Sequence, residues 1–277
     1  MADTAVAQPF DIGDLRREVE AHPLWYHTIE LAPGLVTPGW FDLRPVVAGM
    51  PWPDVSGKRC LDVGTYDGFL AFELERRGAA EVVATDIGDP SGWDWPLITR
   101  DRGTRAVTST AGGKTGVGFQ IAKRALSSSV ERVEASVYDL RPEQVGRFDV
   151  VVCGSLLLHL RDPVRAVEAI RGVCDGSFLS AETVSLPLTM LHRRRPAAEL
   201  KGDRNCQWWI PNVAGHVQML VAGGFRIDRR SGRYAVPFGP GHPAGHGRLK
   251  RLPQRALARL AAGGVGVPHH AALATPR

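Results

Sequence analysis

The sequence predicts an α/β fold, a mostly parallel sheet with helices on both faces. An apolar run that ends at Asp62 is followed by a glycine-punctuated turn and then by Phe69 and Phe72 among charged residues. This is the pattern of a strand, a tight loop and a helix. A second apolar run, 81–86, ends in an acid, and a third, 148–153, is apolar apart from one aspartate. Continuous apolar runs are typical of parallel strands that are buried on both faces.

The turn after the first strand has the composition of a nucleotide-binding loop. Gly64 and Gly68 allow backbone conformations and a close approach of an adenosyl group that side chains would block. Asp86, at the end of the second strand, is placed to accept hydrogen bonds from ribose hydroxyls, as in a Rossmann-type unit. A dinucleotide fingerprint also needs glycine at the positions of Tyr66 and Phe69. NAD is therefore disfavoured.

Segment 62–68 resembles motif I of the class I S-adenosylmethionine (SAM) methyltransferases, Asp/Glu-x-Gly-x-Gly-x-Gly, with Tyr66 in place of the middle glycine. The other elements follow in that family's order: Asp86, then 137–140, then 148–160. The resemblance implies a Rossmann-like, mostly parallel seven-stranded sheet and SAM as the cofactor. The residues it implies for SAM binding are Asp62, Gly64, Thr65, Tyr66, Gly68, Asp86, Ile87, Tyr138, Asp139, Leu140 and Ser155.

Two residues of that set have a more specific expected role. In the family, the turn that contains Asp139 contacts adenine, so its carboxylate is expected to accept from the exocyclic amine while Leu140 packs on the base. The alternative for Asp139 is a helix cap before Pro142, because aspartate is common at such turns.

Residues 25–236 also resemble a narrower group within the class I methyltransferases. The aromatic lead-in, the stretch 156–160 and a late segment, 202–212, resemble the bacterial wobble-uridine tRNA carboxymethyltransferases and their relatives of unassigned substrate. That tRNA enzyme has a tyrosine, which helps to hold the extra carboxylate of carboxy-SAM, where this chain has Leu158. Leucine would leave the carboxylate unpaired, so ordinary SAM is the expected donor.

Length and composition favour one large domain with attached segments. The chain has 277 residues and 44% hydrophobic residues, enough for a full core. We expect a helical and aromatic lid at 1–50, a methyltransferase domain at 51–238 and a basic, disordered tail at 239–277. Two long insertions, 88–115 and 185–211, are expected to form a lid on the acceptor side.

Several protein classes are excluded by the same composition. No apolar run approaches the roughly 20 residues that cross a bilayer, and residues 1–9 lack the pattern of a secretory signal. A cytoplasmic protein without a membrane partner is therefore expected. The four cysteines form no C-x-x-C pair, so neither disulfides nor a metal site is expected.

The net charge of +5 is concentrated near the end of the chain. From Arg226 onward there are ten Lys and Arg against one acid, Asp228. Such a tail can attract nucleic acid, although its Gly, Pro, His and Ala content favours a solubilising, disordered end. The run 193–195, three arginines, suits either a lid or a contact with phosphates. Binding of tRNA is therefore kept as an alternative.

Further elements are predicted along the chain from capping residues, periodicity and turns. They are a helix at 11–21, extended aromatic segments at 24–31 and 36–44, a helix at 118–128, a strand at 130–137, a helix at 162–173, a strand at 178–184, a helix at 212–222 and a terminal antiparallel hairpin of 225–227 with 234–238.

The catalytic candidates are His159, Tyr26 and His27. An imidazole can take a proton from a hydroxyl or an amine near neutral pH, which favours His159 as general base. The alternative is that His159 only shapes the pocket. The expected substrate pocket comprises Trp93, Trp95, Leu158, Trp208 and Trp209.

Three functions are compatible with these residues. The first is a SAM-dependent methyltransferase that acts on an oxygen, nitrogen or carbon of a small-molecule acceptor in secondary metabolism. The second is a methyltransferase that modifies the wobble uridine of tRNA. The third, a non-catalytic SAM-binding module, is disfavoured by the elaborate loops on the acceptor side. The oligomeric state stays open.

Overall fold

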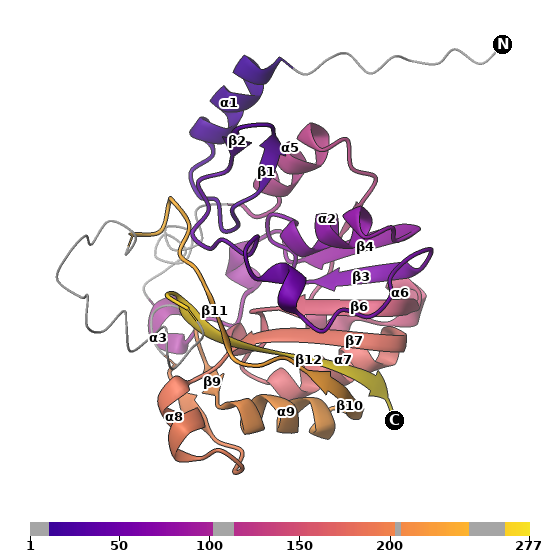
Figure 1. The fold of residues 1–277 in the computed structure, drawn as a ribbon, viewed down its shortest axis with the longest axis vertical. Helices are drawn as coiled ribbons and strands as arrows, with labels where there is room; N and C mark the ends of the chain where they lie inside the picture. The colour runs from indigo at the N-terminus through magenta and orange to yellow at the C-terminus, as the bar shows by residue number, and fades with distance from the viewer. Residues whose placement is uncertain (1–10, 102–113, 203–205, 244–263) are drawn as a thin grey trace.

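A computed structural model describes residues 11–101, 114–202, 206–243 and 264–277. Its core is an eight-stranded sheet of order β10-β12-β7-β6-β3-β4-β5, with β11 paired to β12 (Figure 1). The pairs that join β5, β4, β3, β6 and β7 are parallel, whereas β12 runs antiparallel to each of its neighbours. The strands are β3 (Arg59–Val63), β4 (Glu81–Asp86), β5 (Glu131–Glu134), β6 (Phe148–Gly154), β7 (Cys174–Thr183), β10 (Phe225–Arg230), β11 (Tyr234–Val236) and β12 (Val267–Pro276).

Helices cover both faces of this sheet, which confirms the predicted α/β architecture. Figure 1 shows α1 (Ile12–Ala21), α2 (Phe69–Arg76) and α5 (Val117–Ala125) on one side, and α7 (Pro163–Val173) and α9 (Val213–Ala222) on the other. Successive strand residues enter opposite apolar cores, because side chains alternate along a strand. On β12, for example, Ala271 belongs to the core under α2, whereas Ala272 belongs to the core under α7.

The end of the chain is part of the sheet, so the expected disorder of 239–277 is wrong for residues 264–277. The inserted strand β12 lies between β7 and β10, where Ala271 pairs with Ala181 and Ala274 pairs with Phe178. Both alanines are fully buried. Alanine and histidine have little β-propensity of their own, and burial between two strands supplies the stabilisation instead. The helix expected within 244–263 lies outside the described residues.

The same strand corrects the predicted terminal hairpin. Instead of pairing with each other, β10 and β11 both pair with β12: Phe225 lies opposite Pro276, and Tyr234 lies opposite His269. The antiparallel edge was predicted, but its central strand comes from the far end of the chain.

Helices α1 and α7 begin at the aspartate caps that the sequence predicts. Asp11 caps α1 by accepting from Gly13 N at 2.7 Å, and Asp162 caps α7 by accepting from Arg165 N at 3.0 Å. The strand expected at 130–137 is shorter than predicted, since Val137–Asp139 forms a 3₁₀ turn.

The remaining elements are β1 (Glu30–Ala32), β2 (Leu35–Val36), η1 (Val47–Gly49), η2 (Pro90–Gly92), α3 (Leu97–Arg100), η3 (Val137–Asp139), α6 (Pro142–Val145), η4 (Leu157–His159), α8 (Leu186–Leu191), β8 (Ala198–Leu200) and β9 (Trp209–Pro211).

Among the described residues, no helix combines the length and the apolar character that crossing a membrane requires.

Candidate active site

A cavity of about 470 Å³ opens at the carboxyl ends of the parallel strands. It is bordered by Gly64 after β3, by Gly154 and Ser155 where β6 ends, and by Thr183 at the end of β7. Ligands of open α/β sheets bind at this edge. Most of the remaining wall is aromatic or histidine, from Tyr26, His27, Trp40, Phe41, Tyr66, Trp93, Trp95, His159, Tyr234, His242 and His269.

The predicted glycine turn has the left-handed backbone that its sequence demands. Gly64 has φ 77° and Gly68 has φ 93°, and a Cβ on Gly68 would lie 2.5 Å from the Phe72 ring. Tyr66, which replaces the middle glycine of motif I, also has a positive φ, 48°. The turn therefore keeps its shape at a cost of about 1–2 kcal/mol for the tyrosine, and the Tyr66 side chain becomes part of the cavity wall.

Two of the predicted cofactor-binding carboxylates lie at the ends of neighbouring strands. Asp62 is 1% exposed, its Oδ2 has no hydrogen-bond partner among the described residues, and burial raises the pKa of its carboxyl to about 7. Asp86 accepts from Tyr66 N and from Ile87 N, each at 2.7 Å. The Asp62 carboxyl can therefore accept a hydrogen bond from a ligand. The Asp86 carboxylate is held at the end of β4 and has further lone pairs available.

A third carboxylate, Asp67, was not singled out from the sequence. Its Oδ2 accepts from Tyr26 N at 2.6 Å and from His27 N at 3.0 Å. These bonds join the N-terminal segment to the glycine turn and bring Tyr26 and His27, both predicted site residues, to the cavity. Burial raises the pKa of Asp67 to about 7. The only sequence signal was an ionisable residue inside a turn that packs against a core.

The imidazole of His159 is fixed in one orientation. Its Nδ1 donates to the Cys206 carbonyl at 2.7 Å, so Nε2 carries the free lone pair. Burial lowers the pKa of His159, which keeps the ring neutral near pH 7. His27 also lines the cavity, but burial lowers its pKa to about 3, which makes it a weak base. Of the two predicted histidines, His159 is the better proton acceptor.

Glu182 supports the backbone that carries His159. Its Oε1 accepts from Leu156 N and from Leu157 N, each at 3.3 Å, at the start of the η4 turn. Glu182 is 1% exposed, and burial raises the pKa of its carboxyl to about 8. A protonated or ionised Glu182 can keep both contacts, because each needs only an acceptor oxygen.

His269 is a cavity residue that sequence reasoning missed. Its Nδ1 donates to Val267 O at 2.8 Å, and its Nε2 lies 2.9 Å from Ser155 Oγ and 3.2 Å from Thr183 Oγ1. Burial lowers its pKa to about 4. The residue was overlooked because its strand was assigned to the disordered tail; the apolar run that follows Pro268 was the available signal.

The predicted substrate residues divide into two groups. Trp93, Trp95 and Leu158 line the cavity, and the two indole rings stack with centroids 5.7 Å apart. Trp208 and Trp209 are not among the residues that line the cavity. Their indole nitrogens donate to Asp94 O at 2.5 Å and to Arg161 O at 3.0 Å, respectively. The residues just before them, Cys206 and Gln207, form the lining.

Of the predicted cofactor set, Gly64, Tyr66 and Ser155 line the cavity. Tyr138 is turned to the acceptor-side insertion: its hydroxyl donates to Asp94 Oδ2 at 2.5 Å and accepts from Asp162 N at 3.1 Å. Leu140 is buried in the core. The residues that lie outside the described cavity lining are Asp62, Thr65, Gly68, Asp86, Ile87, Tyr138, Asp139 and Leu140.

Within the described part of the chain, no cluster of three or more His, Cys, Asp or Glu could hold a metal ion. All four cysteines are buried, and none of them forms a disulfide with a described residue.

The strand order and the site at its carboxyl edge define a Rossmann-like methyltransferase fold. The crystal structure of the N-terminal domain of EvdMO1 in the presence of SAH and D-fucose superposes with a TM-score of 0.54 at 13% identity, covering 98% of this chain and 100% of that chain. No family model matches the chain.

Among curated proteins, the chain is similar to ubiquinone biosynthesis O-methyltransferases. The protein of Acinetobacter baumannii (strain AYE) is 31% identical over 115 residues, 42% of this chain and 38% of the relative. That of Hahella chejuensis is 29% identical over 178 residues, 63% of this chain and 62% of the relative. The chain thus spans less than two thirds of the length of these relatives.

The structural likeness confirms the predicted methyltransferase fold, and the similarity to curated methyltransferases agrees with the prediction of an enzyme. The similarities reported above do not confirm the narrower resemblance to wobble-uridine tRNA enzymes, which stays a prediction.

Proposed function

We propose that this protein is a SAM-dependent methyltransferase that acts on a small, flat, apolar acceptor. The observation that carries the proposal is the aromatic cavity built directly on the glycine turn, with the Tyr66 ring 5.2 Å from Tyr26 and 6.4 Å from Trp93 between centroids. Aromatic side chains favour apolar or aromatic ligands, which stack on their faces.

Gly64, Tyr66 and Ser155 would border the cofactor from the cavity wall, and Asp62 and Asp86, outside that lining, would contact it from the ends of β3 and β4. SAM, when bound, supplies a methyl group that is already activated on a sulfonium. Asp86 would accept hydrogen bonds from the ribose hydroxyls, and the unpartnered Oδ2 of Asp62 would accept from the ammonium of the methionine part. A buried acceptor without a donor costs free energy, so a ligand that supplies the donor is favoured. The adenine roles of Asp139 and Leu140 are part of the same proposal.

Leu158 decides between two donors in this proposal. It is 5% exposed and lines the cavity, and its apolar side chain cannot pair a carboxylate. Carboxy-SAM would therefore keep an unpaired charge there, so ordinary SAM is the proposed donor.

Transfer then depends mainly on alignment and on exclusion of water, which the aromatic wall provides. His159 would hold the reactive hydroxyl or amine of the acceptor and take its proton at Nε2, because Nδ1 is committed to Cys206 O. Tyr26 lines the same cavity and would orient the acceptor, its phenol kept neutral by a pKa that burial raises.

The chemistry and the place of this reaction in the cell follow from the same proposal. The similarity to O-methyltransferases favours a hydroxyl acceptor. A cytoplasmic enzyme of secondary metabolism is the expected setting. The tRNA alternative rests on the basic residues, of which 244–263 lie outside the described part of the chain.

Titration calorimetry with SAM, followed by incubation with methyl-labelled SAM and a panel of catechols, phenols and aromatic amines, tests the proposal. Binding of SAM and label in a phenol or amine product are the expected results. Failure to bind SAM, or transfer of label to tRNA alone, would contradict it.

A further inference from the structure

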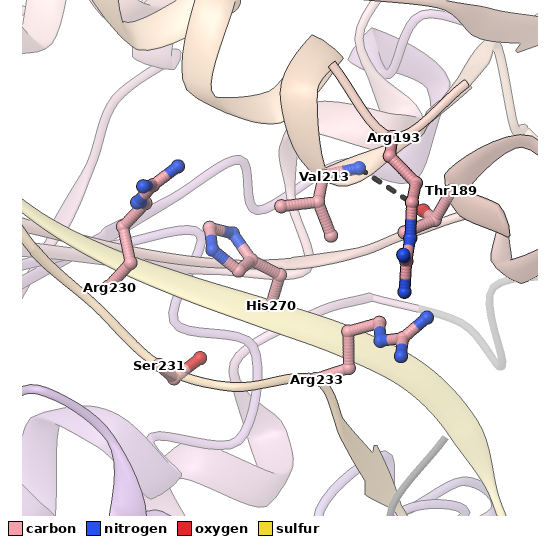
Figure 2. A pocket seen from close by; sticks show the side chains of 7 residues that line it. All are labelled: Thr189, Arg193, Val213, Arg230, Ser231, Arg233 and His270. Carbon is pink, nitrogen blue, oxygen red and sulfur yellow. Dashed lines mark hydrogen bonds between the residues drawn. The ribbon is translucent and has the colours of Figure 1, made fainter. Parts of the chain in front are cut away.

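A second pocket, of about 400 Å³, lies on the other side of β12. Three arginines, Arg193, Arg230 and Arg233, surround it, and His270 lies between them in Figure 2. None of its lining residues belongs to the candidate active site. The two pockets are separated by the sheet, because neighbouring residues of a strand point to opposite faces.

The pocket concentrates positive charge without a compensating acid. Among the described residues, no carboxylate lines it and none forms an ion pair with its three guanidinium groups. The nearest acid in sequence, Asp228, is paired with Arg226 at 3.1 Å. Three like charges around one hollow repel each other, and an anion between them removes that repulsion.

The first turn of α9 adds to the positive electrostatic potential of the pocket. Val213, its first residue, lines the pocket, so the positive end of a ten-residue helix faces the same space. Val213 N already donates to Thr189 Oγ1 at 3.2 Å, as Figure 2 shows. The helix therefore contributes its dipole, and the arginines contribute the donors.

His270 forms the buried floor of the pocket. It is 2% exposed, and its Nδ1 lies 2.9 Å from Nδ1 of His216, whose Nε2 lies 2.9 Å from Ser180 Oγ. This chain of side chains fixes the ring and leaves Nε2 of His270 without a hydrogen bond to the described residues. Nε2 of His270 is therefore a fixed polar atom that can contact a ligand bound by the arginines.

We propose that this pocket binds the phosphoryl group of a small anionic ligand, such as a phosphate monoester or a diphosphate. Forked guanidinium donors match phosphate oxygens, and each charge-assisted hydrogen bond is stronger than a neutral one. The buried His270 and the limited volume favour a compact anion. A nucleic acid backbone would also use exposed arginines that do not line the pocket, such as Arg194.

Titration calorimetry of the full chain with inorganic phosphate and with diphosphate tests the proposal. R230Q and R233Q are expected to bind diphosphate at least about tenfold more weakly than the wild type, the effect of losing about 1.4 kcal/mol. R194Q, a change of equal charge outside the pocket, should bind as the wild type does. R233K should bind diphosphate more tightly than R233Q, since it restores the charge without the fork.

A thermal unfolding series controls for loss of structure. Diphosphate should raise Tm in the wild type and in R194Q, and should raise it less in R230Q and R233Q. Absence of binding by both anions, or equal loss in R194Q, overturns the proposal. A single-stranded RNA oligomer that binds more tightly than diphosphate, with R194Q as damaging as R230Q, would identify a nucleic acid surface instead.

Discussion

His269 and His270 are neighbours on β12 and face opposite sides of the central sheet: His269 lines the candidate active site, and His270 forms the floor of the anion pocket. Both are buried, and burial lowers the pKa of each to about 4. One strand from the end of the chain therefore supplies a polar residue to each pocket. An occupant of either pocket can stabilise β12 through binding to the folded state.

Replacing Asp86 by alanine should weaken SAM binding by about 1–3 kcal/mol, the cost of losing a charge-assisted hydrogen bond. The variant also loses the bonds to Tyr66 N and Ile87 N, so the glycine turn loosens. Calorimetry with SAM measures the effect, and Asp89→Ala, on the exposed loop nearby, is the control. Unchanged affinity in Asp86→Ala would remove that residue from the site.

SAM should bind more tightly than carboxy-SAM, because Leu158 offers no hydrogen bond to a carboxylate. Side-by-side titrations decide the order of affinity. Leu158→Tyr should narrow the difference, since a phenol donates to the carboxylate. Preference of the wild type for carboxy-SAM would mean that another residue supplies the contact, and would favour the tRNA alternative.

His159→Asn should reduce turnover by about 10²–10⁴-fold with little change in SAM affinity, since a general base acts in the transition state. The wild-type rate should rise with pH through the pKa of His159, which burial places below its ordinary value, and should level off above it. The variant should lack that rise. His192→Asn, at an exposed histidine, is the matched control. A small loss of turnover and an unchanged pH profile would assign catalysis to alignment alone.

Glu182→Gln should make the free energy of unfolding less dependent on pH. Burial raises the pKa of Glu182 from 4.5 to about 8 in the folded state, so the proton binds more tightly there than in the unfolded chain. Its stabilising contribution is complete below the unfolded pKa and is lost as pH rises through about 8.

Relative to the wild type, Glu182→Gln should therefore gain about 1–4 kcal/mol in stability between pH 5 and pH 9. Glutamine keeps an acceptor for Leu156 N and Leu157 N, which isolates the titration from the hydrogen bonds. Urea unfolding of both proteins at these pH values provides the comparison. If the free energy of unfolding has the same pH dependence in both proteins, Glu182 is ionised in the folded protein across this pH range.

Local sequence patterns are sufficient to predict the strands β3, β4 and β6, the glycine turn and the acid at Asp86. Each depends on residues close together in the chain, where apolar runs and glycine torsions act locally. The same local pattern placed His159 after β6. It could not show that Nδ1 donates to Cys206 O, a partner from another part of the chain.

The positions of β12, His269 and His270 depend on partners that are distant in the sequence, so only the tertiary structure shows them. Inserting β12 beside β7 pairs Ala271 with Ala181 and buries a run of alanines and histidines that has little strand preference of its own. It also brought His269 to one pocket and His270 to the other. The free energy that orders this segment comes from two neighbouring strands and two apolar cores, none of which is encoded near it in the chain.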